Sequence, residues 1–400
     1  MNIFVINSGS SSIKYQLFNM PGQTPVCSGL VERIGLEDAV ITHKVLVGQE
    51  EKVVVEHLSL ADHGEGLREV ARLLTQGESA VIKDPSEIEV VGHRVVHGGK
   101  AFASTTIIDD TVKAKIKSLF QLAPLHNPAN YQGIEVAETI FTKATQVAVF
   151  DTAFHQTMPP KAYLYAIPPS YYNNHNIRAY GFHGTSHKYV SEQAAEYLKN
   201  LSAKLITIHL GNGCSMAAID AGKCIDTSMG FGPLNGLVMG TRSGDIDPSV
   251  IFHLINQLGY EPGQVSNLLN NRSGLLGLTG FSDMRDIAKA ITDGNAEASL
   301  ALELYAYRVK KYIGAYMAAL NGLDAIIFTA GVGENDPATR QRICTQLDYL
   351  GIAINTEEND VRKKGIHDIS AASAKVKVLV VPTNEELEIA RQCYGLLKEN

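Results

Sequence analysis

Short apolar runs separated by polar loops give the chain its first recognisable pattern. Three runs near the start are rich in Val, Ile, Leu and Phe, and turn-type residues separate them, which predicts buried β-strands. The same strand–loop–strand–turn–strand plan returns in the middle of the chain, and this repetition predicts a duplicated domain. The six strands predicted in this way are residues 3–6, 13–18, 26–30, 205–210, 216–219 and 224–226.

A second pattern, with apolar residues three and four positions apart, runs from Leu302 to Leu320 and stops at Asn321 and Gly322. It predicts a long amphipathic helix, and we interpret its apolar stripe as core rather than a cofactor site. A shorter amphipathic segment covers residues 66–74. Because strands alternate with helices in both halves, the predicted class is α/β. The remaining predicted strands are residues 89–91, 146–150, 325–329 and 375–381.

Loops of small residues follow three of the predicted strands, at residues 7–12 (NSGSSS), 211–215 (GNGCS) and 331–335 (GVGEN). Glycine and serine leave backbone N–H groups free to approach a polyanion, and such loops bind phosphates. Three of them, spread over both halves of the chain, predict a nucleotide held between two domains.

Charge and composition exclude several classes of protein. With 35 Lys and Arg against 42 Asp and Glu, the net charge is −7, which argues against a nucleic-acid groove or a basic membrane face. No run approaches the roughly 18 apolar residues of a membrane span, and the N-terminus lacks the features of a signal peptide. The five cysteines form no CxxC pair, which favours reduced thiols in a cytoplasmic protein.

Charged and polar side chains stand in motifs where a core would need apolar ones. Arg94 follows a strand, Asp151 ends another, His183 lies between glycines, Arg242 lies in a turn-rich stretch, and Glu385 follows the last strand. Each taken alone also fits a surface ion pair or a helix cap. Together with three phosphate-type loops they indicate phosphoryl transfer, in which positive groups neutralise charge and carboxylates hold Mg²⁺.

Three other kinds of site fit less well. His183 and His187 have the i, i+4 spacing of a zinc pair, but the glutamate of H-E-x-x-H is absent and Gly184 weakens a helix there. A serine hydrolase would need a G-x-S-x-G elbow, and a Walker loop would need Gly-Lys-Ser/Thr, and the sequence has neither.

The motifs together resemble the acetate kinase family, with its propionate and butyrate kinases. The resemblance implies the fold shared by actin and hexokinase, in which two ribonuclease-H-like domains enclose ATP. We expect one domain of residues 1–150 plus 385–400 and a second of residues 151–384. The matching stretches keep their order over nearly the whole chain and are residues 7–14, 92–98, 123–128, 149–159, 180–187, 209–213, 236–248, 273–277 and 382–386.

The resemblance also implies roles for single residues. Arg94 would bind the substrate carboxylate, Asp151 would be the essential carboxylate, and His183 and Arg242 would stabilise the transferring phosphoryl group. Asn7 and Glu385 would hold the metal. The pocket for the acid's methyl group would be formed by Val96, Leu125, Phe182 and Pro233. The ATP site would contain Lys14, His209, Leu210, Gly211, Asn212, Gly213, Asp283, Met284, Arg285, Gly331, Val332, Gly333, Glu334 and Asn335.

The resemblance further implies a homodimer that converts ATP and acetate to ADP and acetyl phosphate with Mg²⁺, or alternatively Mn²⁺, in agreement with the cytoplasmic location that the cysteines favour. A propionate kinase is the alternative within the family, and a nucleotide-driven binding protein on the same fold is the alternative outside it. The sequence departs from the family pattern at Ala179, at Ala330, and at residues 231–235 around Pro233, which leaves the shape of the acid pocket open.

Overall fold

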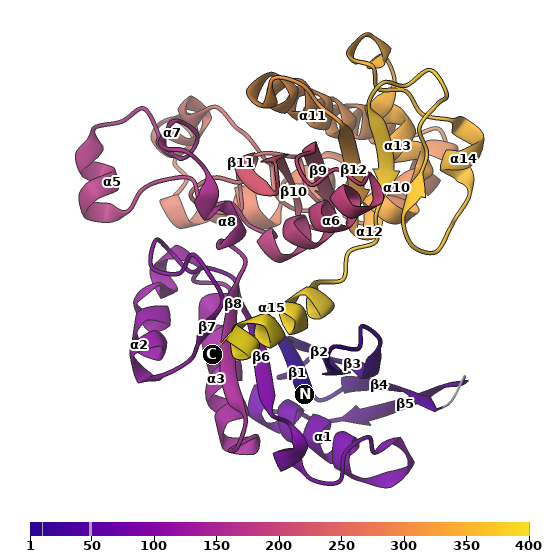
Figure 1. Cartoon of the computed structure of the whole chain (residues 1–400). Helices are drawn as coiled ribbons and strands as arrows, with labels where there is room; N and C mark the ends of the chain where they lie inside the picture. Colours follow the sequence, from indigo (N-terminus) through magenta and orange to yellow (C-terminus); the bar gives the residue numbers. More distant parts are fainter. Residues whose placement is uncertain (10, 48–49, 400) are drawn as a thin grey trace. The chain divides into compact units, whose positions relative to one another are not determined.

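A computed structural model describes residues 1–9, 11–47 and 50–399, so Ser10 of the predicted serine loop lies outside the described residues. The chain divides into two compact units. Unit 1 contains Met1–Phe154 and Asn384–Asn400, and unit 2 contains His155–Thr383. Each unit is built around one mixed β-sheet with helices, so the predicted α/β class is confirmed (Figure 1).

The sheet of unit 1 has eight strands in the order β5-β4-β3-β2-β1-β6-β8-β7. Strand β1 runs antiparallel to β2 and parallel to β6, and β6 runs parallel to β8. The carboxyl ends of β1, β6 and β8 therefore meet at one edge of the sheet, where ligand sites of α/β folds commonly lie. The strands are β1 (Asn2–Ser8), β2 (Ser12–Asn19), β3 (Pro25–Glu32), β4 (Ala39–Val47), β5 (Glu50–Leu58), β6 (Val90–Val95), β7 (Thr106–Ile107) and β8 (Thr145–Phe150).

Helices cover both faces of this sheet. Side chains alternate between the two faces along a strand. On one face, Phe4 of β1 belongs to a hydrophobic cluster with residues of α1 (His63–Thr75) and α3 (Asn127–Ile140). The opposite face contacts α15 (Glu385–Glu399), where a Cβ added at Gly92 would lie 2.9 Å from Ile389 and Cys393. Gly92 thus allows α15 to approach β6 closely. Helix α2 (Asp110–Ser118) packs on α3.

The sheet of unit 2 has six strands in the order β11-β10-β9-β12-β14-β13. Its first five strands repeat the order and directions of β3-β2-β1-β6-β8. In both sheets the first three of these strands are antiparallel neighbours, and the last two run parallel to the third. This repetition agrees with the duplication read from the sequence. The strands are β9 (Lys204–Leu210), β10 (Cys214–Asp220), β11 (Lys223–Thr227), β12 (Ala325–Thr329), β13 (His367–Asp368) and β14 (Lys377–Val380).

Two helices cover the faces of the second sheet. Helix α6 (Gly184–Tyr197) packs on the face that carries Thr207 and Ser215, and α11 (Ala296–Leu320) packs on the face that carries Cys214. The other helices of unit 2 are α4 (Pro160–Tyr163), α5 (Pro169–His175), α7 (Pro248–Asn256), α8 (Pro262–Asn271), α9 (Gly274–Thr279), α10 (Met284–Thr292), α12 (Ala330–Asn335), α13 (Pro337–Cys344) and α14 (Thr356–Asp360).

The predicted strands are all present, most of them longer by one to three residues, and the predicted helix at 302–320 is α11. It ends at Asn321, which adopts the left-handed conformation with φ of 51°. The prediction of a loop at residues 331–335 was wrong, because these residues belong to the short helix α12. Its start is fixed by Glu334, whose carboxylate accepts a hydrogen bond from the backbone N–H of Ala330 at 2.9 Å.

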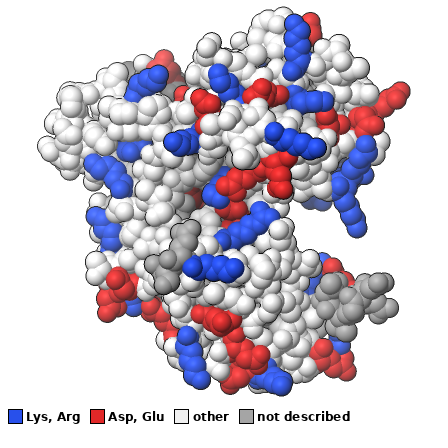
Figure 2. Space-filling view, viewed as in Figure 1, with Lys and Arg blue, Asp and Glu red and all other residues white. Residues whose placement is uncertain are grey.

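Acidic and basic side chains alternate over the face drawn in Figure 2, and the described residues on it form no continuous basic patch. In the described part of the chain, no helix combines the length and the apolar character that crossing a bilayer requires.

Candidate active site

Arg94 is the centre of a charged cluster in unit 1. Its guanidinium donates hydrogen bonds to the carboxylate of Asp151 and, at 3.3 Å, to Oδ1 of Asn7. The Nε atom of Arg94 lies 3.6 Å from the carboxylate of Glu385. The structure therefore brings together four of the residues singled out in the sequence.

The topology explains this convergence. Asn7 lies near the end of β1, Arg94 near the end of β6, and Asp151 directly after β8. These strands are parallel neighbours, with Val5 beside Gly92 and Arg94 beside Val149. Polar side chains at the ends of adjacent parallel strands are thus held within reach of one another.

Burial and neighbouring charges shift the pKa values in this cluster. Burial alone lowers the pKa of Arg94, but Asp151 and Glu385 outweigh it and raise that pKa above its ordinary value. Burial, assisted by the charges of Asp151 and Glu386, raises the pKa of Glu385 to about 6. Carboxylates crowded in this way favour a cation beside them.

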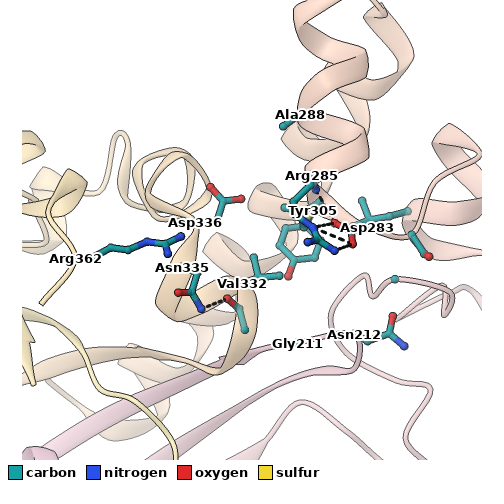
Figure 3. Close-up of a pocket in the computed structure, with 15 residues that line it drawn as sticks. Gly211, Asn212, Asp283, Arg285, Ala288, Tyr305, Val332, Asn335, Asp336 and Arg362 are labelled. Atoms are coloured by element: carbon teal, nitrogen blue, oxygen red, sulfur yellow. Dashed lines mark hydrogen bonds and ion pairs between the residues drawn. The ribbon is translucent and has the colours of Figure 1, made fainter. Parts of the chain in front are cut away.

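Lys14 takes part in the same cluster through a different carboxylate. Its ammonium lies 2.8 Å from Glu386, whose side chain is only 4% exposed. A buried carboxylate needs such a partner, so this ion pair accounts for much of the position of Lys14. Lys14 belongs to unit 1, whereas Gly211, Asn212 and the other residues that line the cavity shown in Figure 3 all belong to unit 2.

The four residues predicted for the acid pocket differ in their surroundings. Val96 of unit 1 is buried and its backbone N–H donates to Asn130, whereas Leu125 of the same unit is 66% exposed. Phe182 of unit 2 is buried, and the carbonyl of Pro233 accepts a hydrogen bond from Arg242 at 3.1 Å.

His183 and Arg242 face the same small space in unit 2. A Cβ added at Gly213 would lie 3.5 Å from Nε2 of His183 and 3.7 Å from Nη1 of Arg242, so glycine keeps this space open. The His183 ring stacks on His209 with centroids 4.2 Å apart. Burial lowers the pKa of Arg242, and among the described residues no carboxylate forms an ion pair with it.

A cavity of about 650 Å³ opens in unit 2 beside this space (Figure 3). Arg285 folds back onto Asp283 at 2.6 Å, and Asn335 donates to the carbonyl of Gly331 at 2.9 Å. Both pairs are drawn in Figure 3. The cavity is large enough for a nucleoside group. Of the residues predicted for ATP, the cavity is lined by Gly211, Asn212, Asp283, Met284, Arg285, Gly331, Val332 and Asn335.

The remaining residues predicted for ATP do not line this cavity, and most have a local structural role. The carboxylate of Glu334 accepts from the N–H groups of Ala330 and Thr383, at 2.9 and 3.0 Å. The carbonyl of Gly333 accepts from the buried Arg340. The residues in this group are Lys14, His209, Leu210, Gly213, Gly333 and Glu334.

Several lining residues were not predicted from the sequence. Tyr305 belongs to the stripe of α11 that we interpreted as core, and it lines the cavity as well as packing against β10. A stripe at helical spacing cannot distinguish a core from a cavity wall, so the sequence held no signal for it. The others are Gly240, Leu275, Ser282, Ala288, Asp336 and Arg362.

Comparison with known proteins agrees with these features. The model of the acetokinase family matches residues 2–391. The chain is 57% identical to a Flavobacterium johnsoniae acetate kinase over the full length of both, and 53% identical to one from Thermotoga petrophila over 100% of this chain and 99% of the other.

Two solved structures are also similar. The acetate kinase of Porphyromonas gingivalis superposes with a TM-score of 0.92 at 43% identity, covering 99% of each chain. A propionate kinase of Francisella tularensis superposes with a TM-score of 0.91 at 42% identity, covering 98% of each. With its family model matched from residue 2 to residue 391, this chain belongs to the acetokinase family.

Proposed function

We propose that the chain is an acetate kinase that catalyses ATP + acetate ⇌ ADP + acetyl phosphate. The observation that carries this proposal is the full-length identity of 57% to an acetate kinase. In the forward direction a carboxylate oxygen of acetate attacks the γ-phosphorus. The new O–P bond forms as the bond to the ADP oxygen breaks, and ADP leaves with those electrons.

Arg94 is proposed to orient the acid, because a guanidinium can bind a carboxylate through two parallel hydrogen bonds. In the structure that fork is occupied by Asp151 and Asn7, which would keep it aimed until substrate arrives. Acetate is already ionised at neutral pH, so its attack requires no general base. Asp151 is therefore proposed to position the metal and its water rather than to remove a proton.

His183 and Arg242 are proposed to stabilise the transferring phosphoryl group. Charge spreads over its equatorial oxygens in the transition state, and fixed donors stabilise it. The close approach of both side chains to Gly213 supports this pairing. Gly211 and Asn212 continue the same loop into the cavity, which is proposed to bind the nucleotide.

Mg²⁺ is proposed as the metal. The candidate donors Asn7, Asp151 and Glu385 would each ligate through a side-chain oxygen, as Mg²⁺ prefers, and Mg²⁺ needs few protein ligands because it keeps several waters. When bound, it would neutralise charge on the phosphate oxygens. Mn²⁺ has similar ligand preferences and is the alternative.

The test is an assay of ADP formation with formate, acetate, propionate and butyrate. We expect the highest kcat/KM with acetate and rates at least tenfold lower without any acid. A preference for propionate would replace the acetate assignment with the second candidate, which the similarity to the Francisella tularensis propionate kinase favours. ATP hydrolysis independent of any acid would instead favour a nucleotide-driven binding protein.

We also propose, from the family resemblance, a cytoplasmic homodimer. The five cysteines are free and buried, which suits a reducing compartment. Sedimentation equilibrium tests the dimer, and a mass equal to one chain would refute it.

A further inference from the structure

A chain of hydrogen bonds leads from His183 into the interior of unit 2. Nδ1 of His183 lies 2.9 Å from Oγ of Ser215, and that oxygen lies 2.7 Å from Nε2 of His187. Nδ1 of His187 lies 2.7 Å from Oγ1 of Thr207. We propose that Thr207, His187 and Ser215 form a relay that fixes both the ring orientation and the proton position of His183.

The secondary structure holds the three members of this relay in place. Thr207 and Ser215 lie on neighbouring antiparallel strands, β9 and β10, and point to the face of the sheet that α6 covers. His187 lies on α6, one turn after His183, which precedes the helix with φ of 56°. Thr207, His187 and Ser215 are all completely buried, so no bulk water competes for their hydrogen bonds.

The direction of proton donation along the relay can be derived. Burial, together with the nearby His155 and His209, lowers the pKa of His187 well below its ordinary value. His187 is therefore neutral and has one donor and one acceptor nitrogen. If its donor were Nδ1, the hydroxyl proton of Thr207 would need another acceptor. The described residues provide no hydrogen bond to Thr207 Oγ1 besides that of His187.

A buried donor without an acceptor is costly, so donation runs the other way. Thr207 donates to Nδ1 of His187, the Nε2–H of His187 donates to Ser215, and Ser215 donates to Nδ1 of His183. Neutral His183 then carries its proton on Nε2. That nitrogen lies at the space kept open by Gly213, near the guanidinium of Arg242.

The relay thus gives His183 a neutral N–H donor aimed where the phosphoryl group is proposed to pass. This consequence rests on the proposed catalytic role of His183, whereas the proton positions do not. Thr207, His187 and Ser215 are positioning residues, because they act only through His183. Stacking on His209 constrains the plane of the His183 ring, and the bond to Ser215 constrains its rotation in that plane.

Three variants of the full-length enzyme test the relay through its most remote member. Thr207→Val removes the hydroxyl and keeps the shape, whereas Thr207→Ser keeps the hydroxyl and removes a methyl group. Thr227→Val is the matched control, because Thr227 is a buried residue of the same sheet whose hydroxyl donates to the carbonyl of Met216.

We expect Thr207→Val to lower kcat about 3- to 10-fold, with KM for ATP and acetate unchanged within about twofold. Thr207→Ser and Thr227→Val should stay within about twofold of the unaltered enzyme in kcat. Ser215→Ala, which breaks the contact to His183 itself, should lower kcat about 10- to 100-fold. If Thr207→Ser falls as far as Thr207→Val, packing rather than the hydroxyl is responsible and the relay is refuted.

Nitrogen NMR of the enzyme labelled with ¹⁵N-histidine tests the proton positions independently of catalysis. We expect His187 to be protonated on Nε2 and not on Nδ1, and Thr207→Val to shift the Nδ1 resonance, because that nitrogen loses its hydrogen-bond donor. Protonation of His187 on Nδ1 would overturn the proposal. His183→Ala distinguishes the relay from the proposed catalytic role of His183. A normal kcat in that variant would refute the catalytic role, and the NMR result alone would then decide whether the relay exists.

Discussion

Arg94 and Asp151 form an ion pair in which the carboxylate is only 1% exposed. Arg242 has no such partner among the described residues, and its guanidinium donates to the carbonyl of Pro233 instead. The two arginines proposed for the active site therefore differ in what their removal leaves behind. Loss of Arg94 removes an ion-pair partner of the buried Asp151 carboxylate, whereas loss of Arg242 breaks no ion pair among the described residues.

We expect Arg94→Ala to destabilise the protein as well as to abolish most activity. Removing one partner of a buried ion pair typically costs about 3–5 kcal/mol, because the other charge stays buried. The double variant Arg94→Ala/Asp151→Asn should recover most of this stability without recovering activity. Urea unfolding and the ADP assay measure the two effects, and a double variant no more stable than Arg94→Ala would contradict the explanation.

Arg242→Ala should give the opposite combination. We expect kcat to fall about 10³- to 10⁵-fold, as for arginines that stabilise a transferring phosphoryl group. The midpoint of urea unfolding should change little, because no carboxylate loses its partner. Arg242→Lys should restore little activity, since an ammonium cannot reproduce the planar fork. A near-normal kcat in Arg242→Ala would remove this residue from the mechanism.

Val96→Ala should widen the acid specificity. Val96 is apolar, buried and two residues from Arg94, as the wall of a methyl pocket should be. One methylene group discriminates by about 1–3 kcal/mol, so acetate should lead propionate by roughly 10- to 200-fold before the change and by less after it. Steady-state kinetics with both acids measures the ratio. Leu125→Ala is the comparison, because a side chain that is 66% exposed should affect the ratio less.

The central strands of both sheets could be predicted from the sequence because each is a short apolar run that is buried on both faces. Strands β4 and β5 were not predicted. In β5 the charged residues Lys52 and Glu56 flank a run of only three valines, and so short an apolar run gives no clear strand signal unless its partner strand is known. The position of α15 was also missed, because Glu385 and Glu386 were read as carboxylates after a strand rather than as the first turn of a helix.

The candidate site likewise contains residues that the sequence could indicate and residues that it could not. Residues in small-residue motifs, such as Arg94 and Gly211, carry a local signal. Arg362 and Tyr305 line the cavity proposed to bind the nucleotide only because the fold brings α11 and the segment after α14 to it. Such long-range placement leaves no mark in a single sequence.

Ala330→Gly should stabilise the protein. Ala330 adopts the left-handed conformation, with φ of 65°, which costs a residue with a Cβ about 1–2 kcal/mol. Glycine avoids that strain but loses more entropy on folding, so we expect a net gain of up to about 1 kcal/mol in the free energy of unfolding. The control Ala315→Gly, at an exposed position within α11, should lose about 1 kcal/mol instead. Destabilisation by Ala330→Gly would show that the left-handed backbone is not strained.

Glu385 should make the stability of the metal-free enzyme depend on pH. Its pKa is raised from 4.5 to about 6, chiefly by burial, so the folded protein binds a proton more tightly than the unfolded chain. The contribution of Glu385 to stability is therefore fully present below pH 4.5 and is lost as the pH rises through 6. Glu385→Gln should remove this loss. Relative to the unaltered enzyme, the free energy of unfolding of the variant should therefore be about 1–2 kcal/mol more favourable at pH 7 than at pH 4.5. Urea unfolding without Mg²⁺ at the two pH values measures it, with the exposed Glu357→Gln as the control.

The same substitution should weaken the metal site. Since Mg²⁺ binds the ionised carboxylate, the Mg²⁺ concentration for half-maximal rate should rise as the pH falls below about 6 in the unaltered enzyme. In Glu385→Gln it should be higher at every pH and should lose most of this dependence, because the titrating ligand is gone. The measurement is a set of Mg²⁺ titrations of the rate between pH 5 and 8, with ATP saturating. An unchanged Mg²⁺ requirement in Glu385→Gln would exclude Glu385 as a ligand, while the stability result would still report its burial.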